Sequence, residues 1–327
     1  MAKTRKILFI VNPFSGLKKQ NTIEDLIEKE LNGMQWNWEI VFTKHPGHAK
    51  EISCNAVGNY DVVVAVGGDG TVNEVGSGLV GTDTILGIIP AGSGNGLARF
   101  LNIPLKVNRA LQAIQNSEVK PIDIMKLNDK VSLNVSGIGF DGMISHQFAG
   151  IKSRGPLGYV KLITKEFSKY KSKNYQLKID GIEYDKDAFL ISFANSSQYG
   201  NNFHISPKAK IDDGLIDVCV IREFPKVTAP ALLISMFDKT LDQSKFDEII
   251  LGKHIEVTSD EPLMIHVDGE PVEKCRKALI EIQPLALKVL VPTEEFLKAP
   301  LIAQFQEMGA NLKNIRKRIS ESTMNKQ

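Results

Sequence analysis

The chain has 327 residues, of which 43% are hydrophobic and 24% are charged, and its formal net charge at pH 7 is +2. This length and composition predict a globular protein of two domains and argue against a disordered or fibrous chain. A charge so close to zero also argues against nucleic acid as a partner, because nucleic-acid binders usually carry a marked basic excess.

The cysteines and the N-terminus indicate a cytoplasmic protein. Cys54, Cys219 and Cys275 are odd in number, far apart and without metal-ligand spacing, which is typical of reduced thiols rather than of a disulfide framework. The N-terminus has the cations of a signal peptide, but its apolar run, residues 7–11, is short and meets Asn12-Pro13, so it is interpreted as a first strand. No stretch approaches the roughly 18–20 apolar residues that cross a bilayer. Any membrane contact is therefore expected to be peripheral, at the inner face.

Strand-like and helix-like segments alternate in the first third of the chain. Apolar or alternating patterns predict strands at residues 7–11, 36–42, 61–66 and 85–89, whereas helical spacing predicts helices at residues 23–31, 71–80 and 107–116. Repeated β-α units with short connections predict an open α/β sheet, and such sheets bind ligands at the carboxyl ends of their strands.

The pattern changes from about residue 120 onward. Short apolar runs separated by Asp-Gly and Asn turns follow one another, which predicts a mostly antiparallel β domain. Two helices are expected to interrupt it, one at residues 228–240 and one whose shared apolar face contains Val160, Ile163, Phe167 and Tyr170. The domain boundary is expected within residues 121–128.

The stretch "VGGDGTVNE" at residues 66–74 follows an apolar strand directly. Glycines at a strand end let the backbone approach a ligand closely, and the amides of a following helix N-terminus bind anions, phosphate above all. Asp69 would repel a phosphate unless a metal ion or a transferable proton is nearby, so it indicates Mg²⁺ or acid–base chemistry. The alternative is a simple turn, since Asp-Gly recurs at residues 141–142, 180–181, 213–214 and 268–269.

Two further loops of small residues follow predicted strands, "NPFSG" at residues 12–16 and "PAGSGNGLAR" at residues 90–99. Three such loops at strand ends of one α/β domain can converge on a single nucleotide. Neither a Walker loop nor a protein-kinase catalytic loop occurs in the sequence. "GIGFDG" at residues 137–142 fits G-x-G-x-x-G, but its neighbours are predicted β-domain strands, so it is not interpreted as a dinucleotide site.

With these motifs the sequence resembles the lipid-kinase family that contains bacterial diacylglycerol kinases and eukaryotic diacylglycerol and sphingosine kinases. "NPFSG", "VGGDGTVNEV", "PAGSGNGLARFLNIP", "GIGFDG", "SPKAKIDDGLIDV" and "HVDGE" occur in the family's order and approximate spacing. The resemblance implies an α/β nucleotide-binding domain, similar to NAD kinases and phosphofructokinases, packed on a β-sandwich lipid-substrate domain, with the active site in the cleft between them. It assigns residues 1–124 to the first domain and residues 125–290 to the second, and it implies that residues 291–327 pack back on the first.

The resemblance also implies the cofactors ATP and Mg²⁺ and the residues that hold them. The positions that match the family's ATP-binding residues are Asn12, Pro13, Ser15, Gly16, Thr43, Gly67, Gly68, Asp69, Gly70, Thr71, Asn73, Glu74, Gly92, Ser93 and Asn95. Asp69 would organise Mg²⁺ and the γ-phosphate. Lys210, Asp213 and Leu215 match a structural Mg²⁺ site that uses the Asp213 carboxylate and two backbone carbonyls, and oxygen ligands suit this ion. A solvated turn is the alternative for that segment.

Glu270, the last residue of "DGE", matches the family's proton acceptor, with Asp268 two residues before it. Asp69 is the second candidate for the base, because the "GGDG" aspartate has that role in the sphingosine branch. Many bacterial diacylglycerol kinases have Asp after the Asn of the third loop, whereas Gly96 stands here, as small residues do in sphingosine kinases. Asp141 of "GFDG" could then contact the hydroxyl or the amine of a lipid, or be a turn residue.

The resemblance therefore implies a kinase that transfers the γ-phosphate of ATP to a lipid hydroxyl, first of all diacylglycerol, giving phosphatidate. The alternatives are a sphingoid base or another long-chain lipid as acceptor, an NAD kinase-like enzyme, and a regulator that binds nucleotide or lipid without turnover. A C-terminal helical stripe could pack on the protein itself, form a homodimer, or place its basic end on a membrane that carries the lipid substrate. The stripe consists of Leu301, Phe305, Met308, Leu312, Ile315 and Ile319.

Overall fold

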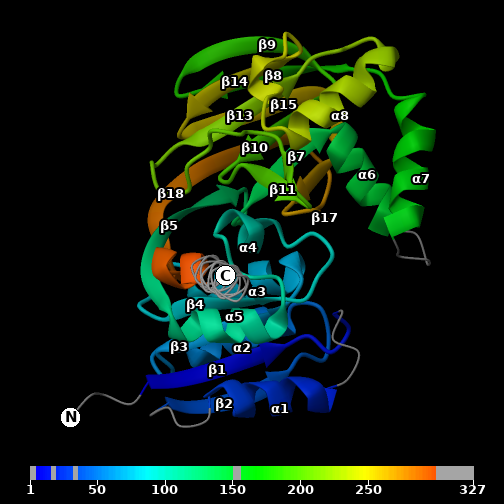
Figure 1. Ribbon diagram of the computed structural model, residues 1–327. Coiled ribbons are helices and arrows are strands. Elements are labelled where there is room, and N and C mark those ends of the chain that lie inside the picture. The colour runs from blue at the N-terminus through cyan, green and yellow to red at the C-terminus, as the bar shows by residue number, and fades with distance from the viewer. Residues whose placement is uncertain (1–4, 16–19, 32–35, 150–155, 300–327) are drawn as a thin grey trace, which may run out of the picture.

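The computed structural model describes residues 5–15, 20–31, 36–149 and 156–299 (Figure 1). The C-terminal stripe and its basic end lie outside these residues. In the figure the chain forms a lower unit of helices around a parallel sheet and an upper unit that is mostly β structure. The predicted fold class, an α/β domain followed by an antiparallel β sandwich, is confirmed.

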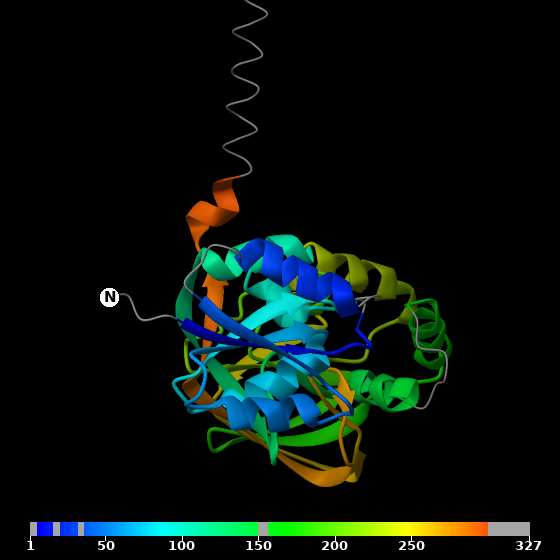
Figure 2. The same ribbon diagram turned by 90° about the horizontal axis from the view of Figure 1, so that it is seen from below.

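The lower unit is built on four parallel strands: β2 (Trp36–Phe42), β1 (Arg5–Val11), β3 (Val62–Gly67) and β4 (Ile85–Pro90), adjacent in that order. β3 is buried at every position, as a parallel strand covered on both faces must be. Helices α1 (Gln20–Leu31) and α5 (Val107–Gln115) cover one face, and α2 (His48–Ala56) and α3 (Asp69–Leu79) cover the other (Figure 2). The short helix α4 (Gly96–Phe100) follows β4.

Two long strands join the lower unit to the upper one. β18 (Cys275–Pro292) pairs in parallel with β4 through Val289 and Leu86, and along its length it pairs antiparallel with β5 (Ser117–Leu127). A single ten-stranded sheet therefore runs through both units, in the order β2-β1-β3-β4-β18-β15-β8-β9. β5 also pairs with β18, and β6 (Lys130–Ser132) pairs with β5. The residues after β18 return to α5, where the Phe296 ring lies 4.4 Å from the Arg109 guanidinium.

The upper unit is a sandwich of two antiparallel layers. One layer is the far part of the long sheet, with β15 (His254–Leu263), β8 (Lys173–Ile179) and β9 (Ile182–Ala188). The other contains β14 (Asp247–Gly252), β13 (Ile216–Ile221), β10 (Leu190–Ala194), β7 (Val135–Gly139), β16 (Ile265–Val267) and β17 (Glu270–Pro271) in that order. Phe193, Val218 and Val257 are among the residues that fill the core between the layers.

Helices α6 (Phe140–Ala149), α7 (Pro156–Phe167) and α8 (Ala229–Phe237) and a small hairpin of β11 (Gln198–Gly200) and β12 (Phe203–His204) complete the upper unit. Two short 3₁₀ helices, Lys226–Thr228 and Leu241–Gln243, flank α8. The expected helices at residues 107–116 and 71–80 are α5 and α3, and those expected in the β domain are α7 and α8.

Helices α2, α4 and α6 were not expected from the sequence. α6 begins directly after β7 and contains Gly142, whose low helix propensity weakens the sequence signal. A Cβ atom at Gly142 would lie only 2.8 Å from the carbonyl carbon of Met264, so this glycine is needed for close packing of α6 on the sheet. β7 pairs antiparallel with both β10 and β16, so "GIGFDG" has no βαβ unit around it and is not a dinucleotide fingerprint.

Candidate active site

The loops that follow β1, β3 and β4 meet at one edge of the parallel sheet. The Asn12 amide donates to the Val66 carbonyl at 3.0 Å, and the Ala91 amide donates to the Gly67 carbonyl at 2.7 Å. Thr43 joins them because its amide donates to the Val11 carbonyl at 2.9 Å. The structure therefore brings together the three small-residue loops and Thr43, as the strand order β2-β1-β3-β4 requires.

Asn12 closes the first loop and fixes it to the second. Its Oδ1 accepts the Phe14 amide at 2.9 Å, and its Nδ2 donates to Oγ1 of Thr71 at 3.1 Å. The Ser15 hydroxyl donates to the Asn12 carbonyl at 2.7 Å, which tightens the turn around Pro13. Gly16, the last predicted residue of this loop, lies outside the described residues.

Glycines are required where the second and third loops touch. A Cβ atom on Gly92 would lie 2.5 Å from the Cα atom of Gly68, and one on Gly67 would overlap the Thr71 side chain. Glycine at these positions lets the two loops pack closely around the N-terminus of α3, and a helix N-terminus favours a bound phosphate. The N-terminus of α3, which begins at Asp69, points into the same place.

Asp69 caps the short helix α4. Its Oδ2 accepts the Asn95 amide at 2.8 Å and its Oδ1 accepts the Gly96 amide at 2.7 Å. Burial raises the pKa of Asp69 above its ordinary value, and the two amides oppose that rise. The carboxylate thus holds the second and third loops together.

Asn73 and Glu74 lie on α3 but are engaged elsewhere. Glu74 accepts the amides of Gly47 and Ala49, at 2.8 and 3.1 Å, and so holds the N-terminus of α2 beside the loop that contains Thr43. Asn73 donates to the Val131 carbonyl at 2.8 Å and to Oδ2 of Asp268 at 2.7 Å. Both side chains are therefore used to hold neighbouring segments in place.

The third loop is closed by Asn95, which lies in the left-handed region with φ 51°. Its Oδ1 accepts the Gly92 amide at 3.0 Å and its Nδ2 donates to the Gly92 carbonyl at 2.8 Å. Ser93, between them, is exposed. This geometry presents the Ser93 hydroxyl at the tip of the loop.

Gly96 has no room for a side chain. A Cβ atom there would overlap Nδ2 of Asn134 and lie 2.7 Å from the Tyr199 carbonyl oxygen. The segment around β11 therefore occupies the space that a side chain at position 96 would need. Asn134 and Tyr199 were not found from the sequence, because only the fold brings them to α4.

Asp268 fastens the upper unit to α3. Besides Asn73, it accepts the Ser132 hydroxyl at 2.7 Å, the Leu133 amide at 2.8 Å and the Asn134 amide at 3.0 Å. Four donors on one carboxylate leave it little capacity to act as a base, so its observed role is to position the turn after β6.

Glu270 follows Asp268 across a tight turn in which Asp268 and Gly269 have φ values of 48° and 90°. Its side chain is exposed, and no hydrogen bond or ion pair of its carboxylate is found within the described residues. Its Oε1 lies 3.6 Å from the position that a Cβ atom on Gly70 would take. An uncommitted carboxylate thus faces the start of α3.

Asp141 is the centre of a polar cluster beneath this turn. Its Oδ2 accepts hydrogen bonds from Tyr199 at 3.1 Å and from Ser192 at 3.4 Å, and it lies 3.1 Å from Nε2 of His266. Its Oδ1 accepts the Gly142 amide at 2.7 Å. Nδ1 of His266 accepts the Gly269 amide at 3.1 Å, so neutral His266 carries its proton on Nε2 and donates it to Asp141.

The predicted metal loop around Lys210, Asp213 and Leu215 lies beside β5 and β18, the strands that join the two units. Oδ1 of the exposed Asp213 accepts the Leu215 amide at 3.1 Å. The fully buried Asp123, which was not found from the sequence, accepts the Gly214 amide at 2.7 Å and the Leu285 amide at 2.7 Å. An acid inside the apolar run "PIDIM" was the signal that could have identified it.

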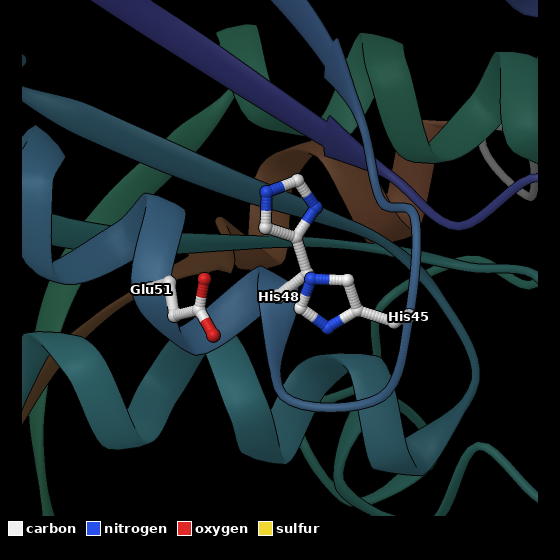
Figure 3. Close-up of side chains that lie close together, drawn as sticks. All are labelled: His45, His48 and Glu51. Atoms are coloured by element: carbon white, nitrogen blue, oxygen red, sulfur yellow. The ribbon is translucent and has the colours of Figure 1, made fainter.

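One group of possible metal ligands is present among the described residues: His45, His48 and Glu51, whose ligand atoms lie within 4.8 Å of one another at the start of α2 (Figure 3). Nδ1 of His48 accepts the Lys44 amide at 3.1 Å, which puts the proton of neutral His48 on Nε2. A metal ion bound to His48 would have to displace either the Lys44 amide from Nδ1 or the proton from Nε2. The observed contacts make His48 a closing residue of the loop before α2.

Comparison with known proteins supports this arrangement along most of the chain. The family described as "Diacylglycerol kinase catalytic domain" matches residues 6–127, and the "YegS C-terminal NAD kinase beta sandwich-like domain" matches residues 134–291. A "Probable lipid kinase YegS-like" of Chromohalobacter salexigens is 30% identical over 238 residues, which are 70% of this chain and 76% of the relative. A protein of the same name from Pseudomonas putida is 26% identical over 268 residues, which are 80% of this chain and 88% of the relative.

Among solved structures, a Bacillus anthracis protein named "putative diacylglycerol kinase" superimposes with a TM-score of 0.74 and is 26% identical. The match covers 89% of this chain and 98% of the other. The likeness therefore extends through both units and includes the joint between them.

Proposed function

The chain belongs to the diacylglycerol kinase catalytic-domain family, and on this premise we propose that it transfers the γ-phosphate of ATP to the hydroxyl of diacylglycerol, giving phosphatidate. The observation that carries the proposal is the position of Glu270. Of the five acids predicted at the cleft, Asp69, Glu74, Asp141 and Asp268 each accept two or more hydrogen bonds within the described residues, whereas the Glu270 carboxylate has no partner there. Among these acids, Glu270 is the one whose carboxylate has room, within the described part of the chain, to take a proton.

The predicted roles follow from the contacts. Phosphoryl transfer requires mainly alignment and neutralisation of charge, which the backbone amides at the N-terminus of α3 would supply. The amides of Asn12, Phe14 and Gly92 already donate within the loops and hold their shape. Asp69 keeps the second and third loops in register by holding the amides of Asn95 and Gly96. Glu270, across from Gly70, accepts the proton of the attacking hydroxyl.

Mg²⁺ fits the oxygen groups at two places. At the phosphates, Asp69 is the acid closest to the loops, and the ion would neutralise charge on the transferred group. At the joint between the units, the Asp213 carboxylate and the carbonyls of Lys210 and Leu215 would hold a structural ion. Asp123 already fixes the backbone of that loop through Gly214, so the oxygen donors are ordered before an ion arrives.

The surroundings of Asp141 favour an uncharged lipid as acceptor. The ammonium group of a sphingoid base needs a carboxylate that is free to pair with it, whereas Asp141 already accepts from Gly142, Tyr199, Ser192 and His266. Gly96 is explained by packing against Asn134 and Tyr199, so the missing acid in the third loop does not point to a different acceptor.

The test is phosphate transfer from γ-labelled ATP, with Mg²⁺, to pure lipids in mixed micelles. Separate reactions contain diacylglycerol, sphingosine and ceramide, and another contains NAD. A labelled phosphatidate product is expected. Label on sphingosine or ceramide with diacylglycerol inert would overturn the proposed acceptor, and label on NAD alone would overturn lipid kinase activity.

A further inference from the structure

Helix α8 exposes an uninterrupted apolar surface. Residues 227–237, which comprise the end of the preceding 3₁₀ turn and the whole of α8, contain no charged side chain, and no residue of α8 is buried. The exposed fractions are 86% for Val227, 49% for Leu233, 59% for Ile234 and 47% for Phe237. Scattered exposed apolar residues are ordinary on a protein surface, but four within eleven consecutive residues form a patch.

The inner side of α8 already has its partners. Leu232 and Met236 pack on the small core that contains Val135 and Leu241. The helix is thus anchored by one face, and Phe237 also contacts the Phe203 ring, with the ring centroids 4.2 Å apart. Leu233 and Ile234 remain exposed on the other face. A rigid helix with one anchored and one apolar exposed side is suited to lie in the interfacial layer of a membrane.

Cations surround this patch. Lys226 precedes it and donates to the Ser168 carbonyl, which places it beside the exposed Lys169 and Lys171 at the end of α7. Lys239 follows α8 at its other end. Residues 165–171 and 222–242, which flank the apolar face, contain six cations and four acids, so cations are in excess around it. The cations are Lys165, Lys169, Lys171, Arg222, Lys226 and Lys239, and the acids are Glu166, Glu223, Asp238 and Asp242. Such a surface is complementary to anionic lipid headgroups.

The patch lies on the side of the molecule that a lipid substrate must approach. β1 enters at the left of Figure 1 and ends at the right, where its loop joins the candidate site, and α6, α7 and α8 also lie on the right. Figure 2 shows the same relationship from below. We propose that the exposed face of α8, with Lys169, Lys171, Lys226 and Lys239 around it, docks the protein on an anionic membrane surface. The proposal rests on the proposed function, which requires a lipid acceptor.

The test measures binding of the full-length chain, without ATP, to sedimented vesicles of phosphatidylcholine with or without phosphatidylglycerol. Ile234→Asp should weaken binding at least about tenfold, since it puts a charge into the apolar face. Ile182→Asp is the matched control: Ile182 is 60% exposed, lies on β9 away from α8, and acquires the same charge. Its binding should equal that of the unmodified protein.

A second arm tests the lysines. Lys169→Glu combined with Lys171→Glu should weaken binding to anionic vesicles by about fivefold or more per residue, and the loss should shrink as salt is added. Lys126→Glu, on an exposed position of β5, is the control and should have no effect. Binding that is equal on neutral and anionic vesicles would overturn the role of the lysines.

Three outcomes separate this inference from the proposed function. Loss of vesicle binding in Ile234→Asp with unchanged phosphorylation of a water-soluble short-chain diacylglycerol supports docking. Normal vesicle binding in Ile234→Asp, together with a change from dimer to monomer in light scattering, overturns it and assigns the face to a second copy. Vesicle binding that depends on Ile234 without phosphorylation of any lipid supports docking and overturns the proposed function alone.

Discussion

The Glu270 carboxylate and Gly70 face each other across the joint between the two units. Oε1 of Glu270 lies 3.6 Å from the position of a Cβ atom on Gly70, which is the second residue of α3. One residue comes from a hairpin of the upper unit and the other from the strand-end loop of the lower unit. The joint therefore places beside the predicted phosphate loops an acid that has no hydrogen-bond partner in the part of the chain that the structure describes.

Glu270→Gln should lower kcat by at least about a hundredfold and leave the affinity for ATP unchanged, because it removes a base but no loop contact. The exposed side chain makes the variant's stability equal to that of the unmodified protein. Steady-state kinetics with diacylglycerol and binding of a non-hydrolysable ATP analogue are the measurements. Glu273→Gln, exposed three residues away, is the control; equal activity of both variants would remove Glu270 from the mechanism.

Asp69→Ala should also lower kcat at least about a hundredfold. Unlike Glu270→Gln, it should also weaken the binding of ATP. The substitution leaves the amides of Asn95 and Gly96 without their acceptor, so stability should fall by about 1–3 kcal/mol. Calorimetry with the ATP analogue and urea denaturation measure the two effects. A variant that lost kcat while keeping both affinity and stability would make Asp69, rather than Glu270, the candidate base.

Gly96→Ala should destabilise the protein by about 1–3 kcal/mol, because the new methyl group meets Asn134 and the Tyr199 carbonyl. Gly70→Ala is the comparison in the stability measurement. The nearest atom to its Cβ lies 3.6 Å away, and alanine is favourable in a helix, so no loss is expected there. Urea denaturation measures the free energy of unfolding of both variants. If Gly96→Ala were as stable as the unmodified protein, the β11 segment would have to move to make room for the methyl group.

Asp213→Ala should abolish stabilisation by Mg²⁺ in the absence of nucleotide. At a Mg²⁺ concentration about ten times the dissociation constant, the ion should contribute about 1.4 kcal/mol, a rise in Tm of about 2 °C for a chain of this size. Thermal unfolding with and without Mg²⁺ measures it. Asp212→Ala, the exposed neighbour, should keep the rise in Tm. An equal rise in Asp213→Ala would place the ion elsewhere.

Asp247 should make stability fall as pH rises. Burial, with the nearby charge of Asp242, raises the pKa of Asp247 from 3.8 to about 7, and neither carboxylate oxygen has a hydrogen-bond partner within the described residues. Above the unfolded pKa the unfolded chain ionises first, so stability declines up to the folded pKa and then levels off.

Asp247→Asn should therefore be more stable than the unmodified protein at about pH 8, by at most about 4 kcal/mol, and nearly equal to it close to pH 4. Guanidinium denaturation at both pH values is the measurement. The same difference in stability at both values would contradict the assigned titration.

None of the helices in the described part of the chain has the length and hydropathy of a membrane span. The proposed encounter with lipid therefore rests on the surface of α8, which the sequence alone did not single out. The sequence predicts α8 as a helix of the β domain but does not predict which of its residues are exposed. The apolar residues of a helix have the same spacing whether they face a core or solvent.

Local patterns in the sequence determined the architecture. Apolar runs such as residues 62–66, each followed by glycines, are sufficient to predict parallel strands that end in phosphate loops, since strand period and backbone freedom are properties of adjacent residues. A hairpin turn at Asp268 and Gly269 was likewise one of the conformations that the sequence predicts, and β16 and β17 pair across it. Strand patterns, glycine loops and tight turns depend mainly on residues that are adjacent in the sequence, so the sequence alone can predict them.

The tertiary structure alone decided which acids are free. Asp69, Glu74 and Asp268 look like site residues in the sequence, and each is engaged by amides that come from another loop or from the other unit. The identity of a side chain reveals its chemistry but not its hydrogen-bond partners, because those partners lie far away along the chain. Glu270 is distinguished from Asp268 only once β18 and β5 have joined the two units and brought the hairpin onto α3.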